Sequence, residues 1–123
     1  MKLTRYFSPV STLIFKAVET RTSVLYSALF AIFPDDTPPA DVYDTLEAVC
    51  TELADPRQAI YTVVVTKKAT GLPGDGFFDM FRTFRHDEYV NIAGRSSTLE
   101  LTNDQKHQIV ALEQLRVYAD AGA

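Results

Sequence analysis

The sequence predicts a predominantly helical α+β domain with about five helices and a small β element of two or three strands. Most segments carry apolar residues at helical spacing, whereas residues 60–66 are rich in β-branched side chains. Gly and Pro clusters separate these segments. With 123 residues, 46% of them hydrophobic and 23% charged, the chain suits one hydrophobic core. We therefore expect a single domain over residues 1–123.

The N-terminal part predicts a helix, a very short strand and a second helix. Ser8 and Pro9 suit a helix start, because Ser can cap free amides and Pro fits the first helical position. Apolar residues then follow helical spacing as far as Val18. β-branched residues gather near 22–25, which predicts the strand, and the second helix is expected over about 27–33.

An acidic amphipathic helix is expected after the Pro-rich segment 34–39. Thr37 can cap this helix, and the prolines fit its first turn. An apolar stripe runs to Leu53, and Asp55 with Pro56 ends the helix. The opposite face carries four carboxylates, namely Asp41, Asp44, Glu47 and Glu52. Residues 23–56 contain no Lys or Arg at all, although the net charge of the whole chain is only −4.

A strand, a turn and a helix are predicted next. The valine-rich run 60–66 reads as a strand that is buried on both faces. Residues 67–76 hold three glycines and a proline, which predicts a turn. Helical spacing then returns from Phe77 to Tyr89.

The last helix has the strongest start signal in the chain. Thr102 and Gln105 have the spacing of a capping box. We expect its apolar stripe to contain Ile109, Leu112, Leu115 and Ala119, widened by Val110, Val117 and Tyr118. Before it, residues 94–97 are predicted as a loop, and Leu99 and Leu101 as a short extended piece.

The run from Ile60 to Phe77, IYTVVVTKKATGLPGDGF, makes the sequence resemble a winged helix. It is similar to uncharacterised bacterial domains in which a VV-x-K-x-TGLPG-x-GF strand and turn follows a helix-turn-helix-like segment. The layout also resembles the winged-helix part of alkyltransferase-like proteins. The resemblance covers about residues 21–78, with a helical extension over about 79–123, and it implies a fold without an assigned activity. Alkyl transfer needs a cysteine in a Pro-Cys-His-Arg context, and Tyr61–Thr66 contains neither cysteine nor histidine.

Candidate catalytic residues are few. Cys50, the single cysteine, lies on the apolar stripe of the acidic helix, so we interpret it as a buried thiol rather than a nucleophile. His86 and His107 lack the spacing of zinc ligands. Asp75 and Asp79 could act as paired carboxylates, but Asp75 is better placed to cap the helix that starts at Phe77. We expect no cofactor and no metal, and an enzymatic or small-ligand role ranks third.

The glycines of the 67–76 turn do not match a nucleotide-binding loop. A phosphate loop needs Lys-Ser/Thr after its second Gly, and a dinucleotide site needs Gly-x-Gly-x-x-Gly. Asp75 would also repel an incoming phosphate. We therefore interpret these glycines as turn residues.

Charge weighs against reading of DNA by the acidic helix. Its four carboxylates would be repelled by the phosphates of a duplex. The leading hypothesis is a non-catalytic protein-interaction or regulatory module, in which the acidic face meets a basic partner. The alternative is a nucleic-acid-associated protein whose phosphate contacts are Lys67, Lys68, Arg82 and Arg85.

A homodimer is a further hypothesis, because aromatic residues cluster after the turn. Phe77 and Phe78 are neighbours on a predicted helix and cannot point the same way, so an aromatic seam of Phe77, Phe78 and Phe81 could contact a second copy. No segment is long and apolar enough to span a bilayer or has the form of a signal peptide. We accordingly expect a cytoplasmic protein with no membrane partner.

Overall fold

The computed structural model describes residues 1–94 and 100–123. The predicted loop at 94–97 and the extended piece at Leu99 therefore lie largely outside the described residues. The elements in chain order are η1 (Thr4–Tyr6), α1 (Phe7–Thr20), β1 (Val24–Leu25), α2 (Tyr26–Phe30), α3 (Pro39–Leu53), η2 (Tyr61–Val64), β2 (Val65–Thr66), α4 (Asp75–Phe84), α5 (His86–Ala93) and α6 (Asn103–Ala121).

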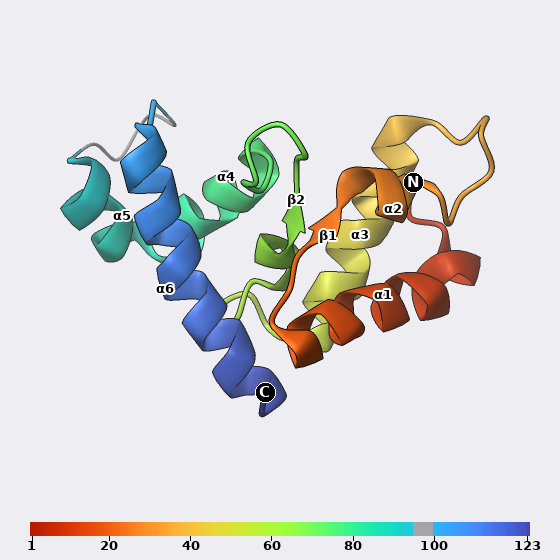
Figure 1. Ribbon diagram of the computed structural model, residues 1–123, viewed down its shortest axis with the longest axis horizontal. Helices are drawn as coiled ribbons and strands as arrows, with labels where there is room; N and C mark the ends of the chain where they lie inside the picture. The colour runs from red at the N-terminus through yellow and green to blue at the C-terminus, as the bar shows by residue number, and fades with distance from the viewer. Residues whose placement is uncertain (95–99) are drawn as a thin grey trace.

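The helices form two groups around a central segment. Figure 1 shows α1, α2 and α3 on one side, α4, α5 and α6 on the other, and η2 with the two strands between them. The strands pair in parallel, with Val24 opposite Val65 and Leu25 opposite Thr66. The prediction of a predominantly helical α+β fold with a small β element is confirmed. The winged-helix resemblance stays a prediction.

The prediction of a strand over residues 60–66 is wrong for most of its length. Tyr61–Val64 forms a 3-10 turn, and the strand is limited to Val65–Thr66. The reason is that helices surround this segment: η2 contacts α1, α3 and α6. All residues from Tyr61 to Thr66 are buried. The β-branched side chains of this segment therefore reflect its burial and do not indicate that its backbone belongs to a sheet.

The predicted helix from Phe77 to Tyr89 is divided at Arg85. This residue has φ −127° and ψ 47°, outside the helical region, and separates α4 from α5. Its guanidinium turns inward, where it forms an ion pair with Glu113 of α6. A polar contact in the core therefore ends the helix, and local sequence gave no sign of it.

The start of α6 is as predicted, and its apolar stripe is confirmed only in part. The capping box is confirmed: Gln105 N lies 3.1 Å from Thr102 Oγ1, and Thr102 N lies 2.8 Å from Gln105 Oε1. Three residues of the predicted stripe are buried, namely Ile109, Val110 and Val117, and so is Glu113, which was not predicted. Leu112 and Leu115, predicted as core, are 38% and 66% exposed.

Three other predicted caps are wrong. The cap of α3 is Pro38 and not Thr37, and no side chain caps this helix. The cap of α1 is Tyr6, because the 3-10 turn η1 leads directly into the helix and places Ser8 inside its first turn. The cap of α4 is Gly74, and Asp75 is the first helical residue. Neither helix start has a side-chain capping bond.

Candidate binding groove

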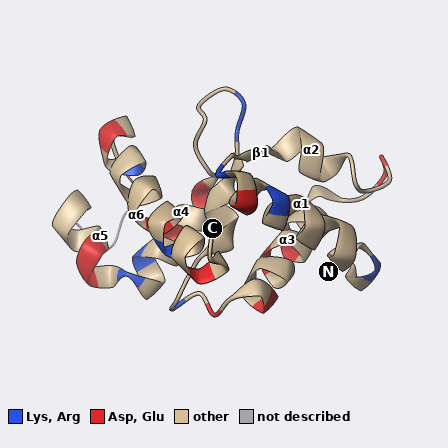
Figure 2. Cartoon of the chain, turned by 60° about the horizontal axis from the view of Figure 1, so that its bottom comes forward, with Lys and Arg blue, Asp and Glu red and all other residues tan. Residues whose placement is uncertain are grey.

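Two members of the predicted acidic face of α3 bind the chain's own N-terminal ammonium. The nitrogen of Met1 lies 2.6 Å from Asp44 Oδ2 and 2.9 Å from Asp41 Oδ1. These two hydrogen bonds, with Asp44 contributing more, raise the pKa of the ammonium above its ordinary value. Glu47 and Glu52 stay exposed, and acidic residues mark α3 in Figure 2. The acidic surface left for a partner therefore centres on Glu47 and Glu52.

The predicted basic patch is not assembled as four phosphate contacts. Two members are exposed in the turn after β2, namely Lys67 and Lys68. Arg82 instead lies 2.5 Å from Asp79 on the same helix. Arg85 is only 9% exposed and is paired with Glu113 at 3.3 Å, so its assignment as a phosphate contact is wrong. Sequence spacing could not reveal this, because the partner of Arg85 lies 28 residues away.

The predicted aromatic seam is buried within the chain. Phe77, Phe78 and Phe81 are 3%, 2% and 0% exposed and pack on one another. Phe77 and Phe78 both pack inside the protein, and the ammonium of Lys106 lies 5.6 Å from the ring of Phe78. These rings are therefore not a surface for a second copy, and the prediction is wrong in this respect. Phe84 is the exposed aromatic residue of α4, at 39%.

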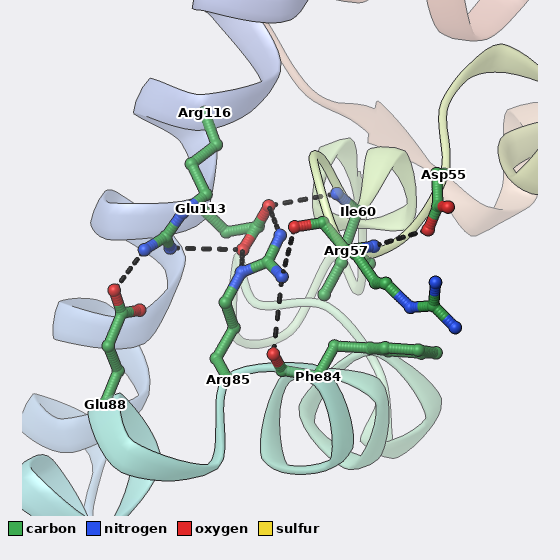
Figure 3. A network of polar contacts seen from close by, with 8 residues as sticks. All are labelled: Asp55, Arg57, Ile60, Phe84, Arg85, Glu88, Glu113 and Arg116. Carbon is green, nitrogen blue, oxygen red and sulfur yellow. Dashed lines mark hydrogen bonds and ion pairs between the residues drawn. The ribbon is translucent and has the colours of Figure 1, made fainter.

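A buried ion-pair network joins α6 to the α4–α5 junction (Figure 3). Glu113 is completely buried, accepts a hydrogen bond from the amide of Ile60 at 2.9 Å and lies 3.3 Å from Arg85 Nε. Arg85 Nη1 also donates to the carbonyl of Arg57 at 2.8 Å. Arg116 bridges Glu113 and Glu88 at the edge. Each charge here has an opposite partner, so the network is structural. Sequence reasoning missed it.

A groove lies between α3 and α4, on the surface above η2. It consists of two hollows, of about 740 and about 530 Å³, which share Glu47 and Met80. The larger one is lined by Tyr26, Tyr43, Leu46, Glu47, Thr62, Lys67, Lys68, Ala69, Gly74, Asp75, Gly76, Phe77, Asp79 and Met80. The smaller one is lined by Glu47, Thr51, Asp55, Pro56, Arg57, Met80 and Phe84. We call their union the α3–α4 groove.

Aromatic contacts fix one end of the groove. The rings of Tyr26 and Tyr43 meet edge to face at 5.9 Å, and Phe30 meets Tyr43 in the same way at 5.6 Å. The hydroxyl of Tyr26 accepts a hydrogen bond from the amide of Gly74 at 3.3 Å. Burial raises the pKa of Tyr26, so the neutral phenol is held here. This end of the groove is therefore preformed.

Thr62 supplies an unused polar group beneath the groove. The residue is 9% exposed, and its buried hydroxyl oxygen has no hydrogen-bond partner among residues 1–94 and 100–123. A buried hydroxyl in this condition costs roughly 1–3 kcal/mol relative to a bonded one. No feature of the sequence marks Thr62, because it lies within a run of buried β-branched residues.

The groove offers binding chemistry rather than a reactive group. Cys50 is buried, and burial raises the pKa of its thiol well above the ordinary value, which suits a structural thiol. Among residues 1–94 and 100–123, no three His, Cys, Asp or Glu side chains gather closely enough to hold a metal ion. His86 and His107 are both exposed.

In the part of the chain that the structure describes, no helix has both the length and the apolarity to cross a bilayer. Comparison of the chain with models of protein families, with curated proteins and with solved structures finds no match in any of the three.

Proposed function

We propose that this protein is a non-catalytic interaction module that holds an extended segment of a partner protein in the α3–α4 groove. The observation that carries the proposal is that the two hollows are neighbours, since Glu47 and Met80 line both. Two neighbouring hollows with apolar side chains suit a linear segment that places alternate side chains in successive hollows.

The apolar side chains are suited to anchor such a segment. Tyr43 lines the larger hollow and Phe84 the smaller one, with exposed fractions of 48% and 39%, and Met80 lines both. Methionine adapts to different side chains, and exposed aromatic rings contribute strongly to binding.

Charge favours a partner segment with basic residues. Glu47 lies where the two hollows meet, and Asp75 lies at the α4 side of the larger one. Neither carboxylate has an ion pair in the structure's described residues. Lys67 and Lys68 lie at the far end, beside the aromatic cluster. A Lys or Arg at the centre of the segment would therefore meet Glu47.

The test uses two pools of short peptides that share apolar positions and differ only at the centre, which is basic in one and acidic in the other. The groove predicts that amide NMR signals of Tyr43, Glu47 and Met80 shift with the basic pool only. Glu47→Lys should weaken binding of that pool by about tenfold or more. Glu19→Lys, on the exposed surface of α1, is the control and should leave binding unchanged.

Equal response to both pools, or shifts confined to other surfaces, would contradict the proposal. A parallel titration with duplex DNA tests the alternative. Binding that depends steeply on salt and is lost in Lys67→Glu/Lys68→Glu would favour a nucleic-acid-associated role instead. A cytoplasmic setting and the winged-helix resemblance remain proposals beside this one.

A further inference from the structure

The side chain of Tyr26 bridges the aromatic end of the α3–α4 groove. Its ring meets Tyr43 of α3 edge to face at 5.9 Å. Its hydroxyl oxygen accepts a hydrogen bond from the amide of Gly74, the cap of α4, at 3.3 Å. Tyr26 therefore contacts both walls of the groove. An extended segment that follows the groove to this end meets the bridge, so it must end there or leave the groove.

A turn held by its own backbone places two lysines at the bridge. Lys67 forms two backbone hydrogen bonds, of 2.9 and 2.8 Å, within residues 67–72. A Cβ on Gly74 would lie 3.0 Å from the hydroxyl oxygen of Tyr26 and 3.8 Å from Cε of Lys67, so both side chains end beside the same backbone position. Lys68 lines the same hollow. Figure 1 shows this turn above β2, between α4 and α2.

These groups have unused bonding capacity for an anion. Neither lysine has an ion pair among the residues that the structure describes. Burial raises the pKa of Tyr26, so its phenol keeps its hydrogen, and no acceptor among the same residues takes it. Asp75, next to Gly74, opposes an anion, but the two lysine charges exceed its single charge. This end of the groove therefore offers ammonium groups and a phenol hydrogen to an incoming acceptor.

We propose that the partner segment is a chain end, with its free C-terminal carboxylate at Lys67 and Lys68. The inference rests on the proposed function and specifies which part of a partner is bound. A chain end fits the bridged end of the groove. Of the two charged chain ends, the carboxylate is the one that complements ammonium groups and a phenol hydrogen. The residues before it would then lead past Glu47 and Met80 to the smaller hollow.

Three forms of the same peptides test the inference. Peptides of the basic pool are made with a free C-terminus, with a C-terminal amide, and with a free C-terminus and an acetylated N-terminus. The free acid should bind at least about fivefold more tightly than the amide, because amidation removes the charge that the two lysines contact. Acetylation should leave the affinity unchanged. Amide NMR signals of Lys67, Lys68 and Gly74 should shift with the free acid.

Lys67→Gln/Lys68→Gln tests the residues. This variant should bind acid and amide equally well, whereas Lys16→Gln, on the exposed surface of α1, should keep the preference for the acid. Comparison of acid with amide in each variant cancels the effect of the protein's net charge. Both lysines are exposed, so the double variant should keep its thermal unfolding midpoint.

Peptides lengthened by glycines beyond the C-terminal residue test the bridge and distinguish a chain end from an internal acidic side chain. They should bind no more tightly than the amide. Equal binding of acid and amide, undiminished binding of the lengthened peptides, or a loss of binding on acetylation would overturn the inference and leave the groove in place. If no form binds, the proposed function fails, and this inference fails with it.

Discussion

A carboxylate without solvent contact lies in the middle of α6, in line with Ile109 and Val117. Its burial is tolerated because a backbone amide and a guanidinium compensate for the water that it loses. The position of Glu113 halfway along an apolar row is a signal in the sequence that could have identified it. Its partner, Arg85, carries no such signal, because an arginine within a predicted amphipathic helix is ordinarily solvated.

Removal of this carboxylate should destabilise the protein strongly. Glu113→Ala leaves Arg85 buried and unpaired, with an expected loss of about 3–5 kcal/mol in the free energy of unfolding. Urea denaturation measures this loss. Glu19→Ala, which removes an exposed carboxylate, should change stability by less than about 0.5 kcal/mol.

Two causes contribute to that loss of stability: the unpaired charge of Arg85 and the missing hydrogen bond to the amide of Ile60. The double variant Glu113→Leu/Arg85→Met separates them. It removes both charges and keeps apolar volume, so it should regain most of the stability. If it is as unstable as Glu113→Ala, the hydrogen bond to Ile60, and not the unpaired charge, is the dominant contribution.

At the scale of elements, prediction succeeded where the local pattern alone decides the structure. The acidic helix α3 and the capping box of α6 formed as expected, because amphipathic spacing and capping residues act within a few positions. It failed at η2 and at the α4–α5 break, where contacts distant in sequence determine the backbone. For the same reason, the α3–α4 groove could be predicted only in its acidic α3 wall.

The start of α4 offers a matched pair of glycine substitutions. A Cβ at Gly74 would lie 3.0 Å from the Tyr26 hydroxyl oxygen, whereas a Cβ at Gly76 meets nothing within 4 Å. Gly74→Ala should lower the free energy of unfolding by roughly 1 kcal/mol, since Tyr26 must move. Gly76→Ala should raise it by roughly 0.5–1 kcal/mol, since alanine favours the helix.

The thermal unfolding midpoints of the two variants measure both effects. Each variant adds one methyl group, so each is a control for the other. Equal shifts of the midpoint would show that the Tyr26–Gly74 contact does not constrain the turn.

At the scale of the whole molecule, the chain buries several weak acids in neutral form. Burial raises the pKa of Tyr26, Tyr61 and Tyr89 and of the Cys50 thiol. The unfolded chain releases these protons at lower pH than the folded chain does. Above about pH 9 the unfolded state therefore binds fewer protons, and stability should fall as pH rises.

Urea midpoints measured at intervals from neutral pH to about pH 11 test this expectation. Tyr61→Phe should reduce the pH dependence, since it removes one of the raised phenols. A midpoint that stays constant above about pH 10 would contradict it.

The buried ion-pair network around Glu113 also affects how the protein unfolds. It connects α6 to the 57–60 segment and to the α4–α5 junction, so the last helix cannot detach without stranding Arg85 in the core. Partial unfolding from the C-terminal end consequently has a high free energy. The two groups of helices should therefore unfold together in one cooperative transition.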